Sequence, residues 1–263
     1  MLRNIFFVVT ILFISNCSSV TDPAKTHKYW YPNANKLRDA STEILQNQSL
    51  NGDVEASLIL GMRMANGDRI KNDPVSAFLI FQKLANKNDP RAQYLLGAAY
   101  ASGLGTDKDE QIAVKWFKKS ALNGYDKGQY WYAHMLSRGR GVKYTDWEEA
   151  IKWFKKASIQ GHTNAQFSLG EAYEQCRGRL DRNFDKAAQW YRIADKYTDN
   201  MLARYNLRRL IDLGLTDWKE GDAGTSPNKF QDITKESFIS CSKGIKDPFL
   251  SEDFKIRPIL TAE

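Results

Sequence analysis

Two nearly identical stretches lie in the middle of the chain, IAVKWFKKSALNG at residues 112–124 and EAIKWFKKASIQG at residues 149–161. Both contain a Trp-Phe pair with lysines on either side, and they begin 37 residues apart. A long stretch that recurs almost unchanged indicates a repeated structural unit rather than a single reactive site.

The Trp-Phe position recurs along most of the chain. The equivalent pairs are Ile80-Phe81, Trp116-Phe117, Trp153-Phe154 and Trp190-Tyr191, at offsets of 36, 37 and 37 residues. Two sets of small residues keep almost the same period: Ala77, Ala113, Ala150 and Ala187, and Gly61, Gly97, Ala133 and Gly170. Three independent positions in phase predict a protein built from stacked units.

Each unit reads as two helices. The first helix is typified by AQYLLGAAYASG from Ala92, whose apolar residues fall three and four positions apart. The second, DEQIAVKWFKKSALNG, has acids at its start and Gly124 at its end, as helix termini favour. The glycines of GLGTDKD at residues 103–109 suit the turn between the two helices.

This pattern resembles the Sel1-like repeat family, a relative of the tetratricopeptide repeats. The resemblance covers about residues 54–213. It is carried by Ala92, Leu96, Gly97, Tyr100, Gly103, Gly105, Ala113, Trp116, Ala121 and Gly124, and by Leu169, Gly170, Tyr173, Gly178, Ala187, Trp190 and Ala194. It implies an all-α, right-handed solenoid of about four helix pairs that binds other proteins and has no fixed catalytic activity.

We place the solenoid at residues 34–215, with a capping helix from about Asn35 to Gln48 before the first unit. The stretch ARYNLRRLIDLGL from Ala203 repeats the first-helix pattern without a second helix and is predicted to be a terminal cap. Residues 216–263 are rich in Gly, Pro, Ser and charge and are predicted to be mostly irregular, with one helix around Asp232 to Cys241.

The Trp-Phe pairs are predicted to form packing core rather than a surface on which bases stack. The lysines beside them are predicted to lie on a solvated outer face: Lys115, Lys118, Lys119, Lys152, Lys155 and Lys156. The net charge of +7 does not indicate nucleic acid, because the Lys and Arg residues are interleaved with 31 acidic residues.

The N-terminus predicts export. One arginine, Arg3, precedes an apolar run from Ile5 to Ile14, which is about 15 Å long as a helix and too short to span a bilayer. Residues 1–16 are therefore predicted to be a signal peptide and residues 17–33 a tether. The residues before Cys17 resemble a lipoprotein processing box, although Asn16 departs from it, so we weigh lipidation of Cys17 against simple secretion. Lipidation with Ser18 next in sequence would place the protein in the periplasm, on the outer membrane.

Cys176 and Cys241 remain after processing. Cys176 stands where earlier units have Gly67, Gly103 and Gly139, a position that favours positive φ. An oxidising compartment allows a Cys176–Cys241 disulfide that would tie the tail to the last repeat. The alternative is two unpaired thiols.

No motif for catalysis or for a cofactor stands out. His27, His134 and His162 lack metal-ligand spacing, and the chain contains no Gly-x-Ser-x-Gly or phosphate-binding loop. Glu148-Glu149 and Glu171-Glu174 are better explained as surface carboxylates than as acid/base pairs. We therefore expect a protein that is not an enzyme and that binds no metal and no cofactor.

Function in a solenoid is carried by positions that vary while the frame stays constant. In each first helix, the residues three and six positions after the leading Ala or Gly vary, and they share one face of the helix. They are Ile59, Met62, Leu95, Ala98, Trp131, His134, Ser168, Glu171, Asn206 and Arg209. We call them the strip and expect it to line the concave side and to bind a partner through Trp131. The alternative is that these residues only complete the packing or face water.

The leading hypothesis is an exported, lipid-anchored scaffold that binds a protein. The resemblance also implies a sharper alternative, an immunity protein that neutralises a phospholipase toxin delivered by a type VI secretion system. A further alternative is a cell-envelope factor with a role in regulation or host interaction.

Overall fold

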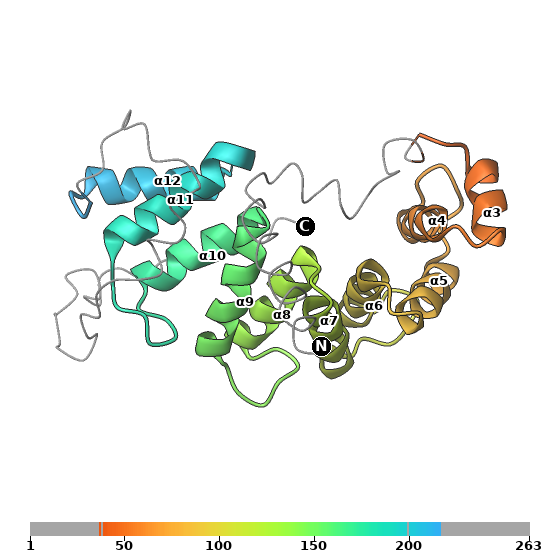
Figure 1. The fold of residues 1–263 in the computed structure, drawn as a ribbon, viewed down its shortest axis with the longest axis horizontal. Coiled ribbons are helices and arrows are strands. Elements are labelled where there is room, and N and C mark those ends of the chain that lie inside the picture. Colours follow the sequence, from red (N-terminus) through yellow and green to blue (C-terminus); the bar gives the residue numbers. More distant parts are fainter. Residues whose placement is uncertain (1–36, 38, 199, 217–263) are drawn as a thin grey trace, which may run out of the picture.

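The computed structural model describes residues 37, 39–198 and 200–216 (Figure 1). These residues form helices and no strand. The helices are α3 (Thr42–Leu50), α4 (Val54–Asn66), α5 (Pro74–Asn86), α6 (Pro90–Ser102), α7 (Glu110–Leu122), α8 (Asp126–Arg138), α9 (Trp147–Ile159), α10 (Thr163–Glu174), α11 (Phe184–Thr198) and α12 (Met201–Asp212).

Consecutive helices pack against each other from α3 to α12. Helices α4, α6, α8 and α10 are the first helices of four units, and α5, α7, α9 and α11 are the second helices. Helix α12 starts a further unit. The units follow one another along an arc that is open at the top of Figure 1, with α3 and α12 at its two ends. The predicted all-α solenoid of helix pairs is confirmed.

Residues at the helix ends explain the lengths of these helices. Asp side chains accept hydrogen bonds from the first-turn N–H groups of five helices, α4, α5, α6, α7 and α9, as Asp53 does for α4 and Asp109 for α7. Gly67, Gly103 and Gly139 end α4, α6 and α8 in the left-handed conformation. Cys176 takes the same slot after α10 with a φ of 54°, so the prediction that this slot requires positive φ is confirmed.

A glycine and an aromatic ring join the two helices inside a unit. A Cβ on Gly97 of α6 would lie 2.8 Å from Cδ1 of Phe117, and one on Gly170 would lie 2.5 Å from Cε1 of Tyr191. Phe117 and Tyr191 are almost completely buried. The small residue lets the ring lie directly on the helix backbone, so Gly and Phe recur together.

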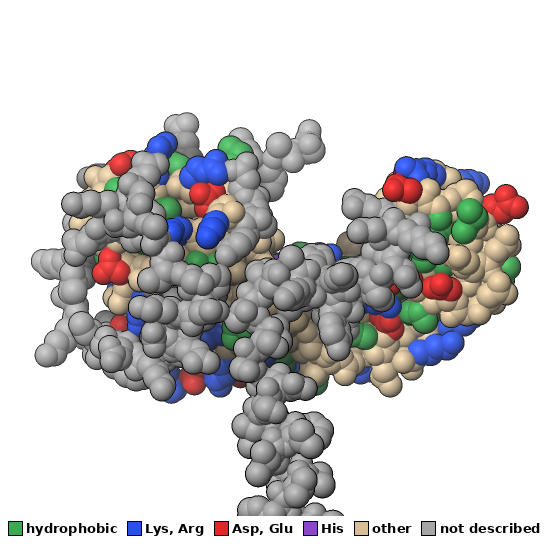
Figure 2. Space-filling view, turned by 45° about the horizontal axis from the view of Figure 1, so that its top comes forward, with side chains coloured by type: hydrophobic (Ala, Val, Ile, Leu, Met, Phe, Trp, Pro, Cys, Tyr) green, Lys and Arg blue, Asp and Glu red, His purple; other side chains and the backbone are tan. Residues whose placement is uncertain are grey.

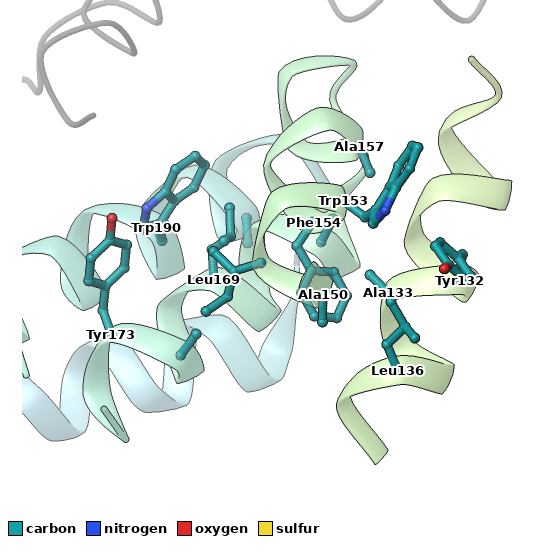
Figure 3. Packing of buried hydrophobic residues seen from close by; sticks show 14 of the residues in the cluster. Tyr132, Ala133, Leu136, Ala150, Trp153, Phe154, Ala157, Leu169, Tyr173 and Trp190 are labelled. Carbon is teal, nitrogen blue, oxygen red and sulfur yellow. The ribbon is translucent and has the colours of Figure 1, made fainter. Parts of the chain in front are cut away.

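The third unit shows the same arrangement with alanine. In Figure 3, Trp153 and Phe154 of α9 point toward α8, where Ala133 takes the glycine position. The Trp153 ring meets Tyr132 edge-on at 5.6 Å. The prediction that the Trp-Phe pairs form packing core is confirmed for Trp153-Phe154 and Trp190-Tyr191, whereas Trp116 is only half-buried.

A second glycine joins neighbouring units. Gly105, in the turn after α6, has a φ of 67°, and a Cβ there would lie 2.1 Å from the carbonyl oxygen of Pro74 in α5. Gly141 repeats this contact, with its Cβ position 2.0 Å from the carbonyl oxygen of Glu110. The equivalent residue of the first unit is Arg69, also at positive φ (56°). Arg69 can carry a side chain because α3, and not a second helix of a preceding unit, lies beside it, as the hydrogen bond from Thr42 Oγ1 to the Arg69 carbonyl shows.

Buried glutamines also tie units together, and the sequence did not single them out. Gln129 of α8 accepts a hydrogen bond from Gln160 Nε2 at 2.8 Å and donates to the Ala121 carbonyl of the preceding unit at 3.4 Å. Gln93 accepts from Asn123 Nδ2 at 2.9 Å within its own unit, and Gln166 donates to the Ser158 carbonyl of the preceding unit at 3.3 Å. An amide that is buried and hydrogen-bonded on both sides fixes the register of adjacent helices.

The N-terminal cap differs from the prediction. The expected helix from about Asn35 to Gln48 is not continuous: residue 37 is helical, residues 39–40 form a turn, and α3 begins at Thr42. Ser41 accepts a hydrogen bond from the N–H of Ile44, and this N-cap interaction starts a new helix after the turn. The C-terminal cap from Ala203 is confirmed as α12.

Several predictions fall outside the described residues. The signal peptide, the tether from Cys17 and the tail helix around residues 232–241 remain predictions. No helix in the part of the chain that the structure describes is long and apolar enough to cross a membrane.

We predict that Gly141→Ala destabilises the fold by roughly 3 kcal/mol or more, because left-handed strain of about 1–2 kcal/mol adds to overpacking against Glu110. The matched control is Gly124→Ala, since Gly124 also has positive φ (86°) but nothing lies within 4 Å of its Cβ position. Urea unfolding followed by circular dichroism measures both variants. Equal losses in the two would show that contact between units does not add to the backbone strain.

Candidate partner-binding surface

The strip residues occupy equivalent positions on α4, α6, α8, α10 and α12. All ten side chains are half-buried: Ile59, Met62, Leu95, Ala98, Trp131, His134, Ser168, Glu171, Asn206 and Arg209. A half-buried side chain is fixed on one side by the fold and still has surface to offer a partner. Figure 2 shows the molecule hollowed between its two ends.

The apolar end of the strip belongs largely to the core. Met62 and Leu95 pack against the cluster that α4, α5 and α6 bury, and Ile59 packs against the cluster under α3. Trp131 and Ala98 pack in the same way against the central cluster, so these contacts fix one side of each side chain and the binding role of the strip stays a prediction.

The centre of the strip is an aromatic group on α8. Trp131 stacks on Phe117 of the preceding unit, with ring centroids 5.9 Å apart and planes at 20°. Its ring also meets Tyr130 edge-on at 5.7 Å and His134 at 5.2 Å. Tyr130 in turn stacks on His162 at 4.5 Å. We call Tyr130, Trp131, His134 and His162 the aromatic cluster.

The prediction named Trp131 and His134 but missed Tyr130 and His162. His162 stands at the N-cap of α10, where the first helices α4 and α6 have Asp53 and Asp89. This departure from the repeat pattern was visible in the sequence. The contact of His162 with Tyr130 was not visible in the sequence. The distance between these two rings depends on the rotation of one helix pair relative to the next.

His134 is neutral at physiological pH. Burial, together with the positive charges of Arg138 and Arg140, lowers its pKa from 6.5 to about 4. Its Nδ1 is buried and has no hydrogen-bond partner among the described residues. The ring therefore acts mainly as an apolar support for Trp131.

A polar network follows the aromatic cluster along α10 and α12. Glu174 accepts a hydrogen bond from the hydroxyl of Tyr191 at 2.7 Å and forms an ion pair with Arg209. Its side chain is 13% exposed, so the prediction of a surface carboxylate is wrong for Glu174. The hydroxyl of Tyr191 and the guanidinium of Arg209 compensate for the burial of this carboxylate.

Glu171 lies one helical turn before Glu174. Burial raises the pKa of Glu171 and the neighbouring Glu174 carboxylate adds to this, whereas Arg138 and Arg177 oppose it. Of these two carboxylates, Glu174 is the one that forms an ion pair with the strip residue Arg209. The strip offers a partner one stacked Trp ring, a half-buried carboxyl group and the exposed Arg138 beside them.

The other carboxylates considered as acid/base pairs have structural partners. Glu149 accepts from Trp153 Nε1 at 2.8 Å and binds Lys152 at 3.2 Å, and Glu148 pairs with Arg179 at 3.2 Å. Within the described ranges, no group of three or more His, Cys, Asp or Glu could hold a metal ion. Cys241 lies outside these ranges, so its disulfide with Cys176 remains a prediction.

Comparison with known proteins agrees with this architecture. The Sel1 repeat model matches residues 54–89, 90–125, 126–162 and 163–194, which is more than half of the chain. The chain belongs to the Sel1 repeat family. The four Sel1 repeats correspond to the pairs α4/α5, α6/α7, α8/α9 and α10/α11.

Among relatives, the Sel1-repeat-containing protein YjcO of Escherichia coli K12 is 32% identical over 101 residues. That match covers 37% of this chain and 43% of YjcO, so less than half of the relative's length is spanned.

Two solved structures are similar to this Sel1 repeat chain. The first is c5321, a protective antigen of uropathogenic Escherichia coli strains, at 28% identity and a TM-score of 0.61, covering 74% of this chain and 42% of that one. The second is a Sel1 repeat protein of Oxalobacter formigenes, at 20% identity and a TM-score of 0.62, covering 88% and 92%. The second likeness shows the fold alone.

We predict that His134 makes the fold acid-sensitive. In the unfolded chain His134 binds a proton near pH 6.5, but in the folded chain only near pH 4, so stability falls as the pH drops between these values. His134→Gln should reduce this loss by about 1–3 kcal/mol. Urea unfolding of both proteins at pH 7.5, 5.5 and 4.5 measures it. Parallel loss in wild type and variant would contradict the assignment.

Proposed function

We propose that this Sel1 repeat protein is a non-catalytic scaffold that binds a partner protein through the strip, with Trp131 as the central anchor. Sel1 repeat proteins typically mediate protein–protein interaction, which supports the general function. The observation that carries the proposal is the position of Trp131, which is half-buried and held by Phe117, Tyr130 and His134.

A braced aromatic side chain suits a binding hot spot. Trp loses little conformational entropy on binding when its ring is already held in place, and it offers a large apolar area with one N–H donor. Arg138 and Glu171 supply charges of opposite sign close to it. Energetically important residues of an interface often have this arrangement, an aromatic centre within a polar rim.

Purifying the protein together with its bound partner would identify that partner. A secreted phospholipase toxin would support the immunity function, and an envelope component would support a regulatory role. No contact among the described residues favours one over the other, so the identity of the bound protein decides.

We predict that Trp131→Ala weakens binding of the captured partner by about 30-fold or more, the effect of losing a hot spot worth at least about 2 kcal/mol. The protein is purified with its partner from its own cells, the partner is identified by mass spectrometry, and its affinity is then measured by calorimetry. The control is Trp147→Ala, because Trp147 is also half-buried but lies at the start of α9, off the strip, where Arg177 covers its ring at 5.3 Å.

Two results would contradict the proposal. One is unchanged affinity in Trp131→Ala, and the other is an equal loss in both variants while circular dichroism shows that both stay folded. The first result would show that the partner binds elsewhere on the protein. The second would show that the loss of affinity comes from a general destabilisation of the repeats.

We also propose that the chain is exported and anchored by a lipid on Cys17, on the strength of the N-terminal sequence. Cys17→Ser is predicted to move the protein from the membrane fraction to the soluble periplasmic fraction, because no acyl chain would remain attached. Cell fractionation with immunoblotting measures this. A variant that stays in the membrane fraction would contradict lipid anchoring at Cys17.

A further inference from the structure

The two copies of the Trp-Phe-Lys-Lys motif place lysines in matching rows. Lys115, Lys118 and Lys119 on α7 are followed by Leu122 at the next turn, and Lys152, Lys155 and Lys156 on α9 are followed by Ile159. This spacing of three, four and seven residues puts each set on one helix face. We call the six lysines the lysine rows.

The lysine rows face away from the core. Lys115 lies two residues before the buried Phe117, and Lys119 lies two residues after it. Two residues correspond to about 200° around the helix axis, so both lysines lie nearly opposite Phe117. Five of the six lysines are exposed, and Lys155 is half-buried. Leu122 and Ile159 are 65% and 61% exposed, so each row ends in an apolar side chain that the fold does not bury.

Aromatic rings lie beneath the lysines and connect the rows. Lys119 Nζ lies 4.0 Å from the ring centroid of Trp116, and Lys156 Nζ lies 3.9 Å from that of Trp153. Lys118 lies over Tyr132 at 5.9 Å, and Tyr132 meets Trp153 edge-on at 5.6 Å. The Tyr132 and Trp153 rings join α8 to α9, Lys118 reaches from α7 to Tyr132, and cation–π attraction holds the ammonium groups over the rings.

The rows carry a surplus of positive charge. Lys152 forms an ion pair with Glu149, and among the described residues the other five lysines have no ion pair. The pKa of Lys155 is lowered by burial and by the charge of Lys186 on α11, so a further positive charge lies close by in the next unit. Glu149 and Asp146 act on Tyr132 beneath Lys118, but they are fewer than the six lysines, so this face keeps a positive surplus.

We propose that the lysine rows, together with Leu122 and Ile159, bind the surface of a membrane that contains anionic lipids. Lysines alone would suit any polyanion, because their attraction to phosphate does not depend on what carries it. The exposed Leu122 and Ile159 favour a bilayer, since apolar side chains gain by entering the boundary between headgroups and acyl chains. A nucleic acid backbone offers them no such environment.

Membrane contact at this face is compatible with partner binding at the strip. Phe117 lies under Trp131 of the strip, whereas Lys115 and Lys119 leave the opposite side of the same helix. The chain can thus lie against a bilayer with α7 and α9 while Trp131 stays accessible. This inference does not depend on the proposed scaffold function.

The test is co-sedimentation of the full chain with vesicles, either pure phosphatidylcholine or phosphatidylcholine with about 30% phosphatidylglycerol. The variant Lys118→Gln, Lys119→Gln, Lys155→Gln and Lys156→Gln is expected to lose about tenfold or more of the affinity for the anionic vesicles. The control replaces the exposed Lys71, Lys87, Lys108 and Lys143 by Gln. It removes the same charge away from the rows and is expected to bind within about threefold of wild type.

A second pair of variants tests the apolar contribution. Leu122→Gln with Ile159→Gln is expected to weaken anionic-vesicle binding by about fivefold or more, since two exposed aliphatic side chains no longer enter the boundary. Its control is Met201→Gln with Leu202→Gln on α12, at side chains that are 76% and 64% exposed. Circular dichroism confirms the fold of each variant, and background binding to phosphatidylcholine is subtracted in every case.

Three outcomes would overturn the proposal. Wild type could bind both kinds of vesicle equally, the two lysine variants could lose the same affinity, or the Leu122 and Ile159 variant could bind as wild type does. Short duplex DNA is titrated in parallel. If the lysine-row variant loses only DNA binding, the rows recognise nucleic acid and the membrane proposal fails.

Discussion

The contact of a turn glycine with the preceding unit sets the spacing of the whole solenoid. A Cβ on Gly141 would lie 2.0 Å from the carbonyl oxygen of Glu110, and one on Gly105 would lie 2.1 Å from that of Pro74. Both residues have positive φ, so glycine satisfies a steric and a conformational requirement at once. Because each unit touches mainly its neighbours, a change in this contact would alter the arc at every later position.

The frame depends on small residues that let buried aromatic rings lie on the helix backbone. Gly97 lets Phe117 lie on α6, and Phe117 in turn supports Trp131 of the next unit. The proposed anchor of the strip is therefore attached directly to the contact that joins two helices. A partner that binds Trp131 would meet a surface that is already rigid, which lowers the entropic cost of binding.

One short motif serves three purposes in successive layers. In Trp116-Phe117-Lys118-Lys119, the Phe fills the space inside the unit, and the Trp lies under Lys119. The lysines point outward. The second copy at Trp153 repeats this arrangement one unit later. Duplication of the motif therefore duplicates both the packing and the outward charge, so a solenoid of like units acquires rows of like charge.

The sequence by itself determined the architecture, because a period of 36–37 residues in glycine, alanine and aromatic positions is a local property that each unit must satisfy. It also placed Trp131 at the centre of the strip and identified the glycine slot that Cys176 fills. It predicted one continuous capping helix, whereas a turn at residues 39–40 and the N-cap at Ser41 separate α3 from the helical residue 37.

The tertiary structure alone decided which side chains meet between units. The stacking of Tyr130 on His162, the ion pair of Glu174 with Arg209 and the contact of Tyr132 with Trp153 join residues that are distant in sequence. Their distances depend on the rotation from one unit to the next. That rotation comes from packing contacts such as Gly141 on Glu110, and no local pattern of residues records it.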